Sequence, residues 1–335
     1  ALCDQNGLPA PPEDLGAPPA SASEQDVGIR VADGSADIIV KGLVSLAGTN
    51  PVVVEAASGV HVQGARVFSP EGAGVWIHDA DGTVLRDVRV WKAGVSGVLL
   101  DGATGTSLEV CTVENGQAGV EVIGEPADGA VGVNRVGRIV PAGTGEVDPP
   151  EPLEWEKKAA PPMPTKAQLI SFANGTHGVW AHDGSVPVAV EGALLIGNNG
   201  DGVHVANYTG DVGVYGSAVG VNPDAGGNPA PAPNANGVVV SGATGLVQVG
   251  ERDRGNIISN NGGHGVLLNV AETVRIQSNI IGLGPPADVP GPNDGAGVDA
   301  TAVQELWIGG HVATDGNLIG ANLGPGVRLD LQATT

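Results

Sequence analysis

The sequence predicts an all-β parallel β-helix, a solenoid of about ten or eleven coils, from three observations. The first is a 23-residue period in the apolar positions between about residues 29 and 120. A fixed period of roughly 20 to 50 residues is typical of solenoids, in which each coil buries its apolar face against its neighbours. Four columns share the period: Ile29, Val52, Val75 and Val98, with Val120 one residue early; Ile39, Val62, Leu85 and Leu108; Gly42, Ala65, Val88 and Cys111; and Val44, Val67, Val90 and Val113.

The second observation is the pattern within each coil, and the third is the composition of the corners. Short apolar alternations such as Val75-Trp76-Ile77 point every second side chain inward, as in a β-strand. Asn-Gly pairs at 115–116, 174–175, 199–200 and 261–262 come shortly before Gly-Val strand starts. Asn and Gly tolerate left-handed backbone angles, so we expect them to turn the corners. A return after 23 or more residues predicts parallel pairing rather than hairpins.

The composition agrees with a packed aliphatic core. Hydrophobic residues make up 41% of the 335 residues but aromatic residues only 3%, and the chain contains 55 Gly and 25 Pro. A disordered chain would lack this apolar share. We therefore expect the interior to consist mainly of Val, Ala, Leu and Ile.

The chain divides into a lead-in and one continuous body. Residues 1–24 are rich in Pro, Ala and acidic residues, which predicts an extended linker. Residues 25–335 are expected to form the β-helix, with an acidic, Pro-rich insertion at about 125–167 that contains Trp155. Insertions in solenoids map to loops on one face, often the binding face. A solvated excursion without a role is an equally good interpretation.

Charge and cysteine content limit the partners. The formal net charge is −22, from 37 acidic and 15 basic residues, which predicts no nucleic-acid partner. No run of about 18 apolar residues occurs, so we expect no membrane insertion. Cys3 and Cys111 could pair in an oxidising compartment, but Cys111 falls in an inward column, where a free, buried thiol packs well.

Several segments of the second half resemble a known family of repeats: Ser278-Asn-Ile-Ile-Gly-Leu-Gly, Trp307-Ile-Gly-Gly and Asn260-Asn-Gly-Gly-His-Gly-Val-Leu-Leu. They are similar to the repeats of bacterial right-handed parallel β-helix proteins, a branch of the pectin-lyase-like superfold. The resemblance is strongest over 197–331 and looser over 28–123, and it implies a right-handed coil. That family includes polysaccharide lyases, hydrolases and epimerases, and also secreted or surface proteins without an assigned activity. The resemblance therefore implies the fold and says little about chemistry.

In the strand that follows the Gly of each Gly-Val start, the second and fourth residues are expected to point outward in two columns. Two nearly identical phrases, Gly-Val-Trp-Ile-His-Asp at 74–79 and Gly-Val-Trp-Ala-His-Asp at 178–183, place Trp76 and Trp180 in the first column. At about 4.8 Å per coil, three coils would separate the two indoles by roughly 14 Å.

We predict that this face binds carbohydrate, because sugar ring faces stack on indoles while sugar hydroxyls need polar partners. The candidate residues are Trp76, His78, Trp180, His182, His204 and, just past its strand, Tyr208. The alternative is that the 125–167 insertion covers Trp180 as ordinary packing and that the histidines are only solvated.

Catalysis and metal binding have weaker support. Asp101 and Glu121 fall on adjacent coils and are candidate catalytic residues, because carboxylate pairs about 5 to 9.5 Å apart hydrolyse glycosides. Asp79 and Asp81 match half of a calcium-loop pattern, which an ordinary Asp-Gly turn also explains. No Cys and His spacing predicts zinc, so we expect no other metal site or cofactor.

Two functions follow from these features. The first is a structural, adhesive or self-assembling module, secreted or displayed on a bacterial cell surface, with self-association through exposed coil ends. The alternative is a polysaccharide-binding protein or a polysaccharide-active enzyme, a lyase or hydrolase, that uses the face between Trp76 and His204. The acidic surface would repel polyuronates, so a neutral glycan is the better candidate ligand.

Overall fold

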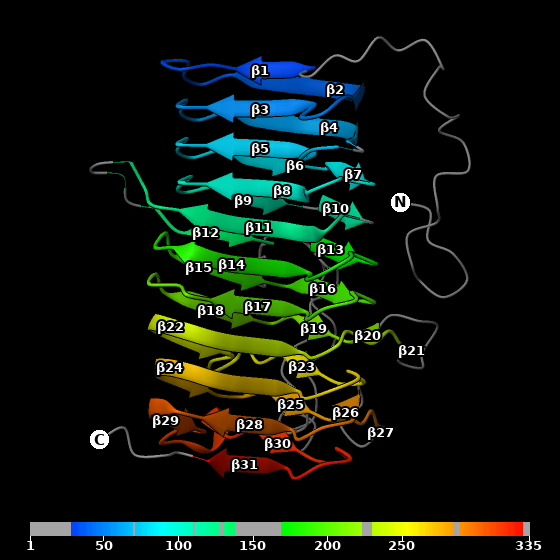
Figure 1. The fold of residues 1–335 in the computed structure, drawn as a ribbon, viewed down its shortest axis with the longest axis vertical. Coiled ribbons are helices and arrows are strands. Elements are labelled where there is room, and N and C mark those ends of the chain that lie inside the picture. Colours follow the sequence, from blue (N-terminus) through cyan, green and yellow to red (C-terminus); the bar gives the residue numbers. More distant parts are fainter. Residues whose placement is uncertain are drawn as a thin grey trace, which may run out of the picture.

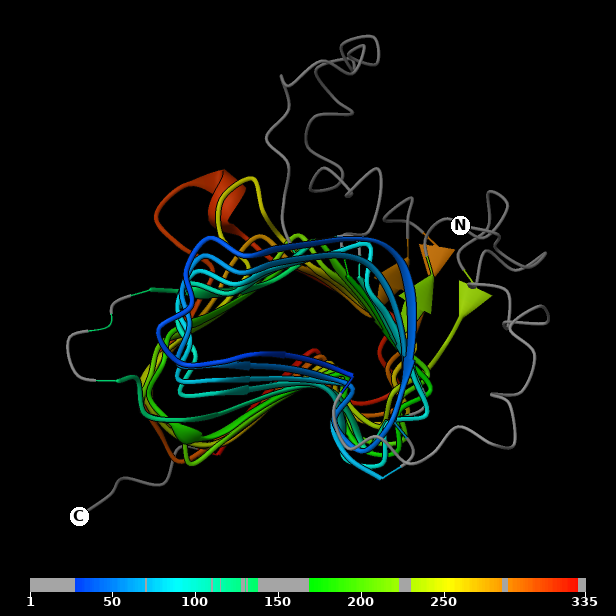
Figure 2. The same ribbon diagram turned by 90° about the horizontal axis from the view of Figure 1, so that it is seen from above.

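The computed structural model describes residues 28–69, 71–109, 111–114, 116–127, 130, 132–137, 169–222, 230–284 and 289–330. These residues form the predicted right-handed parallel β-helix (Figures 1 and 2). The coils follow one another down the long axis from β1 to β31 and wind around a single interior. In the part of the chain that is described, no helix is long and apolar enough to cross a membrane.

The strands stack into three parallel ladders, because each coil turns three corners. The first ladder has eleven strands, one per coil, in agreement with the expected number: β1 (Ile29–Val31), β3 (Val52–Glu55), β5 (Val75–His78), β8 (Ser96–Asp101), β11 (Ala118–Gly124), β14 (Val179–Gly184), β17 (Val203–Ala206), β22 (Val238–Val249), β24 (Val266–Ile276), β28 (Val298–Thr301) and β31 (Val327–Asp330).

The second ladder follows the first in each coil. It contains β2 (Ile39–Ala47), β4 (His61–Phe68), β6 (Val84–Arg86), β9 (Ser107–Glu109), β12 (Asn134–Val136), β15 (Val188–Glu191), β18 (Val212–Tyr215), the later parts of β22 and β24, and β29 (Val303–Ile308).

The third ladder closes each coil. It contains the later parts of β2 and β4, β7 (Arg89–Trp91), β10 (Cys111–Glu114), β13 (Leu169–Phe172), β16 (Ala193–Ile196), β19 (Ala218–Val219), β23 (Ile257–Ile258), β25 (Ile280–Ile281) and β30 (Leu318–Ile319). Two antiparallel hairpins project from its corners, β20 (Val221–Asn222) with β21 (Ala230–Pro231) and β26 (Leu283–Gly284) with β27 (Val289–Pro290). A short 3-10 turn, η2, spans Ala313–Asp315.

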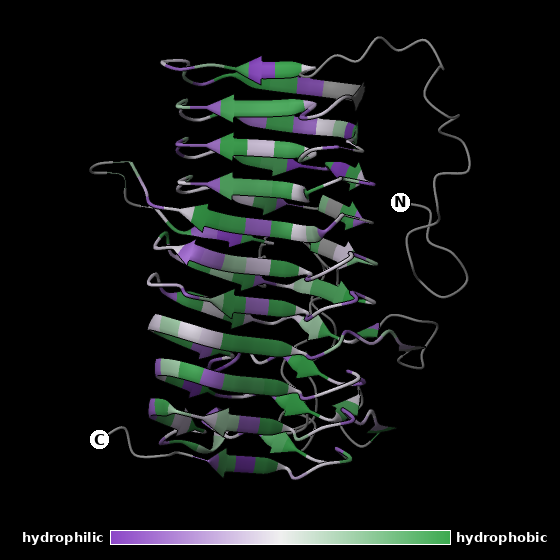
Figure 3. Ribbon diagram, viewed as in Figure 1, coloured by the Kyte–Doolittle hydropathy of each residue, from purple (hydrophilic) through white to green (hydrophobic). Residues whose placement is uncertain are grey.

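The repeating apolar columns form the core. Val52, Val75 and Val98 are Cα partners in successive coils and are fully buried. Figure 3 shows the same division along the rod, with largely hydrophobic strands and more hydrophilic corners. Burial of each valine or leucine side chain stabilises the fold by about 1.5–3 kcal/mol. Stacking of the coils therefore produces a continuous core.

The 23-residue register is wrong at the first coil. Val40, rather than Ile39, is the Cα partner of Val62, and Val44, rather than Gly42, is the partner of Ala65. The shift falls between residues 41 and 44, and Ile39 is left 58% exposed. Among the described residues this coil has a neighbour on one side only, so a single interface sets its register.

Part of the predicted insertion belongs to the β-helix. Residues 134–136 form β12, which pairs with β9 on one side and β15 on the other. The alternating Asn-Arg-Val segment therefore continues the second ladder in the coil where the 23-residue period stops. The rest of the predicted insertion from 138 to 167, with Trp155, and the predicted linker 1–24 lie outside the described residues.

The corner asparagines act differently from the prediction. None of the described residues in the four Asn-Gly pairs adopts left-handed angles. Asn174 and Asn261 instead bury their side-chain amides, which hydrogen-bond to asparagines in neighbouring coils. A buried amide needs such partners, and stacked coils supply them at one corner after another.

Cys111 is free and buried, as its inward column predicts. Burial raises the pKa of its thiol to about 12. Cys3, the alternative pairing partner, lies outside the described residues.

The last described coil is more open than the others. Val327 and Leu329 of β31 are 41% and 52% exposed, whereas their partners Val298 and Ala300 in β28 are buried. This coil has a described neighbour on one side only. Self-association through coil ends stays a prediction.

Candidate functional site

The first predicted outward column lies on the first ladder in the expected order. Glu121 of β11 is the Cα partner of Leu99 on one side and of Trp180 on the other. Trp76 pairs with Leu99, and His204 pairs with Trp180, so the five residues occupy five consecutive coils. The two tryptophans are thus three coils apart, as predicted.

The second outward column lies beside the first, two residues further along each strand. His78 pairs with Asp101, and Asp101 with Ile123. The register shifts after Val122, next to the Ala181–His182 segment of β14. We call the outward side chains of these five strands the Trp76–His204 strip: Trp76, His78, Leu99, Asp101, Glu121, Trp180, His182 and His204.

Glu121 and His182 form the centre of the strip. Glu121 is 9% exposed and accepts hydrogen bonds from the Ser96 hydroxyl and, at 2.9 Å, from Nε2 of His182. The other ring nitrogen of His182 lies 2.9 Å from Oδ2 of Asp183. The His182 ring stacks on the Trp180 indole, with centroids 3.8 Å apart and an interplanar angle of 26°.

These contacts shift the pKa values of both groups in the direction that favours the ion pair. Burial opposes ionisation of Glu121, but the hydrogen bonds from His182 and Ser96 outweigh it and lower the pKa of the carboxyl. Burial also disfavours the imidazolium, but the bonds to Glu121 and Asp183 outweigh it and raise the pKa of His182. The pair therefore carries compensating charges at mildly acidic pH.

A second cluster joins this one at the next coil. Oδ2 of the buried Asp201 lies 2.7 Å from Nδ1 of His204 and 3.4 Å from Nδ1 of His177. Nδ1 of His177 also accepts the backbone N–H of Asp201 at 3.0 Å, and Asn236 donates to Oδ1 of Asp201 at 2.9 Å. Burial opposes ionisation of Asp201, but these side-chain hydrogen bonds outweigh it and lower its pKa strongly. The two imidazole rings lie 4.4 Å apart.

His177 and Asp201 were missed by the sequence prediction. Both lie in corners before the strands. The alternation of inward and outward side chains does not apply there, so it does not predict where these side chains point. One signal was available, because each residue directly precedes a Gly-Val strand start, Gly178-Val179 or Gly202-Val203, and so occupies the same place in successive coils.

At the other end of the strip, Trp76 and His78 form a looser version of the arrangement. Their rings are 5.4 Å apart at 35°, and Nδ1 of His78 lies 3.0 Å from Oδ2 of Asp101 without hydrogen-bond geometry. Nε2 of His78 lies 3.4 Å from Asp79. The indole N–H groups of Trp76 and Trp180 are both buried without an acceptor among the described residues.

Tyr208 does not belong to the strip, so its predicted role is wrong. It is fully buried, and its hydroxyl donates to the carbonyl of Val186. Burial, with the nearby Glu125 charge, raises its pKa. Asn207 just before it adopts a left-handed φ of 49°, which ends the alternation of the strand and turns the next side chain inward.

The two candidate catalytic carboxylates contact different histidines. Glu121, in the first outward column, lies beside His182, and Asp101, in the second, lies beside His78. Their catalytic role stays a prediction. Asp79 and Asp81 occupy a corner in which Asp79 has a left-handed φ of 48° and Asp81 accepts a hydrogen bond from Thr104. A calcium ion at that corner stays a prediction.

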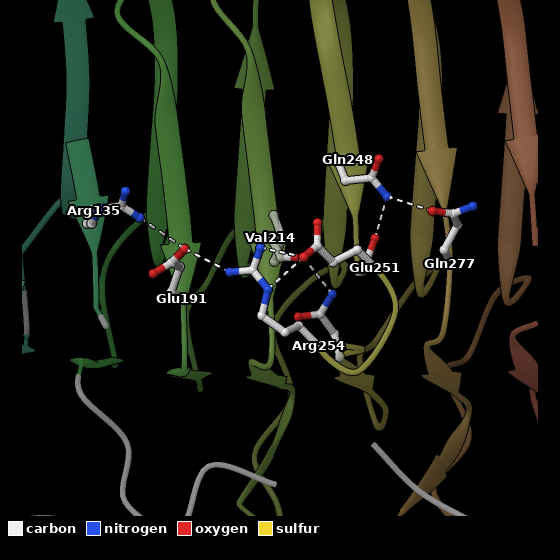
Figure 4. Close-up of polar contacts among 9 residues, drawn as sticks. Arg135, Glu191, Val214, Gln248, Glu251, Arg254 and Gln277 are labelled. Atoms are coloured by element: carbon white, nitrogen blue, oxygen red, sulfur yellow. Dashed lines mark hydrogen bonds and ion pairs between the residues drawn. The ribbon is translucent and has the colours of Figure 1, made fainter. Parts of the chain in front are cut away.

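A further polar cluster lies on the second ladder (Figure 4). Glu191, 5% exposed, pairs with Arg254 at 3.1 Å and with Arg135 at 3.4 Å. Arg254 also bonds to Glu251 and lies over the ring of Tyr215, 4.4 Å from its centroid. Every charged group of this cluster has a partner within it, so we interpret it as a contact that holds neighbouring coils together.

Solved structures resemble this chain at low sequence identity. No protein-family model matches the chain, and no curated protein matches it. Among solved structures, the A-module of the mannuronan C-5 epimerase AlgE4 of Azotobacter vinelandii has a TM-score of 0.45 and 12% identity, covering 91% of this chain and 88% of that one.

Two further structures match less of their own length. The Dettilon tailspike protein has a TM-score of 0.39 and 11% identity, covering 86% of this chain and 60% of the tailspike. The catalytic domain of a GH87 alpha-1,3-glucanase in complex with nigerose has a TM-score of 0.39 and 13% identity, covering 91% and 58%. The fold assignment rests on the strand register described above, and likenesses at this level do not extend to the site.

Proposed function

We propose that the protein is a rigid extracellular β-helix that adheres to a neutral glycan through the Trp76–His204 strip. One observation carries this proposal: ring and carboxylate side chains share one face of five consecutive coils, and contacts within the protein already hold them in place. Groups held in position before binding lose little conformational entropy when a ligand arrives.

The apolar part of the strip suits the ring faces of sugars. Trp76 and Leu99 are neighbours on β5 and β8, and both are half-buried. Trp180 is also half-buried, but His182 occupies one face of its indole. We therefore expect sugar rings to pack mainly on Trp76 and Leu99, with the remaining exposed part of Trp180 as a second contact.

The polar part suits hydroxyl groups rather than charges. Three histidine–carboxylate pairs lie on or beside the strip, formed by His78 with Asp101, His182 with Glu121, and His204 with Asp201. Carboxylates are strong acceptors for hydroxyl donors. Each of these three carboxylates already has an imidazole beside it. The net charge of −22 repels polyanionic chains, which favours a neutral glycan.

The arrangement supports binding ahead of glycoside hydrolysis. Hydrolysis needs one carboxyl group with a raised pKa as proton donor and a second carboxylate across the bond. The pKa of Glu121 is lowered by its hydrogen bonds, and Asp101 is directed to a different histidine. The two groups serve as fixed acceptors in this proposal.

Calorimetric titration with a panel of neutral oligosaccharides and polysaccharides tests the proposal. We expect one ligand class to bind, and Trp76→Ala to weaken its affinity at least tenfold, because truncating an aromatic anchor typically costs more than about 1.4 kcal/mol. Trp180→Ala should weaken binding by a smaller factor, since His182 already covers part of that ring.

Trp307→Ala is the matched control. Trp307 is 39% exposed but lies on β29 in the second ladder, so its removal should leave glycan affinity unchanged. Equal loss in all three variants, unchanged affinity in Trp76→Ala, or a panel without any bound glycan would contradict the proposal.

A further inference from the structure

We propose that His177, Asp201 and His204 form a binding site for a first-row transition-metal ion such as Zn²⁺. The site shares His204 and Asp201 with the polar part of the proposed glycan-binding surface, but metal binding depends on the donor atoms alone and is tested without a glycan. Within the described residues, this is the group in which three or more metal-ligating side chains bring one donor atom each to within 4.8 Å of the others.

The donor set has the chemistry that zinc selects. Two imidazole nitrogens and one carboxylate oxygen are common zinc ligands, with bond lengths of about 2.0–2.2 Å, and sites with three protein ligands keep a position open for water or a ligand. Two donors bound to one tetrahedral ion then lie about 3.3–3.5 Å apart. The ion would replace the proton that His204 and Asp201 share.

The observed separations are close to that requirement. Oδ2 of Asp201 is 2.7 Å from Nδ1 of His204, so this contact must open by about 0.6–0.8 Å. Nδ1 of His177 accepts the backbone N–H of Asp201, so His177 would bind the ion through Nε2. The two imidazole rings already lie 4.4 Å apart. Among the described contacts, Nε2 of His177 and Nε2 of His204 make no hydrogen bond, so either ring can offer a nitrogen while its side chain stays in place.

The surrounding residues hold the donors in position. The Asp201 side chain is 8% exposed, and Asn236 donates to its second oxygen at 2.9 Å. The backbone N–H of Asp201 fixes the ring of His177. Hydrogen bonds of this kind, to the groups behind the donors, orient metal ligands and raise affinity by about 10–100-fold. The imidazoles are 17% and 21% exposed, so an ion can reach them from solvent.

A second histidine occupies the equivalent corner position in a later coil, and its contacts can be compared with those of His177. His264 also precedes a Gly-Val start, and its Nδ1 accepts the backbone N–H of Ala296 at 3.0 Å, as His177 does with Asp201. Its nearest carboxylate, Asp299, is 3.5 Å from Nε2 and is held by Arg328. The capping role of the histidine is therefore shared, whereas the carboxylate between two imidazoles is particular to the His177 corner.

Titration of the tag-free protein with Co²⁺, followed by absorption, tests this site, with Zn²⁺ displacement as the second step. We expect one Co²⁺ per chain with the visible absorption of a nitrogen- and oxygen-ligated ion, its displacement by one Zn²⁺, and a higher thermal unfolding midpoint with Zn²⁺. His204→Gln and Asp201→Asn should each weaken binding at least tenfold and abolish the midpoint shift.

His264→Gln is the matched control, because it removes the equivalent corner histidine and leaves the three donors. Its metal affinity should equal that of the unsubstituted protein. His204 lies on the surface of β17 and caps no backbone group, so His204→Gln should keep the fold, which circular dichroism checks. Absence of stoichiometric binding by the unsubstituted protein, or unchanged binding in folded His204→Gln, would overturn the proposal.

Discussion

The two halves of the β-helix hold their corners in different ways. Between β3 and β8 the coils keep a period of 23 residues, and the equivalent corner residues Ala56, Asp79 and Gly102 all adopt left-handed φ values, between 47° and 62°. The second half retains such corners at Asp183 and Asn207 but adds a buried ladder of side-chain amides where the chain enters the first ladder of strands. Its members are the buried Asn174, Asn198, Asn234, Asn261 and Asn293 and the half-buried Asn322.

The amide ladder joins coils of unequal length. Successive members of the amide ladder are 24, 36, 27, 32 and 29 residues apart, yet each donates to the next at 2.8–3.1 Å. The side chain fixes the corner whatever the length of chain between coils, so hairpins such as β20–β21 are accommodated.

The largest expected effect comes from breaking the amide ladder at its middle. Asn261 is buried, accepts a hydrogen bond from Asn234 and donates one to Asn293. Asn261→Ala removes both bonds. Asn234 still donates to the Leu195 carbonyl and Asn293 still accepts the backbone N–H of residue 261, but one buried N–H of Asn234 loses its acceptor. An unsatisfied buried donor and a lost bond together cost about 2–4 kcal/mol in the free energy of unfolding. Urea unfolding measures it, and hydrogen exchange locates the weakened coils.

Asn199→Ala provides the control for this variant, because Asn199 is an exposed corner asparagine of the same half. It should change stability by no more than about 0.5 kcal/mol. If the two variants lost the same amount, the ladder would not be what holds these corners.

An intermediate effect is expected from a backbone corner of the first half. Gly102 has φ +62°, and a Cβ added there would lie 2.5 Å from Oδ1 of Asp79 and 2.7 Å from the carbonyl of Glu125. Gly82 has φ +65°, but its nearest contact would be 3.8 Å away. Gly82→Ala should cost about 1–2 kcal/mol for the left-handed angle alone, and Gly102→Ala clearly more. Thermal unfolding of both variants checks the order, and the reverse order would refute the steric argument.

The smallest effect is a pH dependence at the junction of the two halves, where Glu121 of β11 meets His182 of β14. The raised pKa of His182 gives a contribution to stability that is complete below its unfolded value of about 6.5 and is lost as pH rises through the folded value. The lowered pKa of Glu121 gives a contribution present above its unfolded value and lost as pH falls through the folded one.

The ion pair should therefore stabilise most between about pH 4.3 and 6.5. The stability difference between the unsubstituted protein and His182→Gln, measured by urea unfolding from pH 4 to 9, should be greatest in that window and stay under about 1 kcal/mol. His311→Gln, which removes an exposed histidine at the far end, should show no such maximum. A difference that grows toward pH 9 would contradict this assignment.

The outward direction of the side chains that lie on strands was predictable from the sequence. Trp76, Glu121, Trp180 and His204 fall in one outward column because side chains in a strand alternate with period two and the coils stack in register. Tyr208 was not predictable in this way, because the left-handed turn at Asn207 ends the alternation before it. His177 and Asp201 lie in corners, where no periodicity applies.

By itself, the sequence determined the coil, its number of turns and which strand residues face inward, since these depend on local alternation repeated at a near-constant spacing. Only the tertiary structure decided which side chains become partners. Glu121 and His182 are 61 residues apart, and Asp201 lies between two imidazoles from different coils. Such contacts depend on the position and direction in which the chain leaves each corner and enters the next coil. Because the corners differ in length, residue spacing in the sequence does not predict that position or direction.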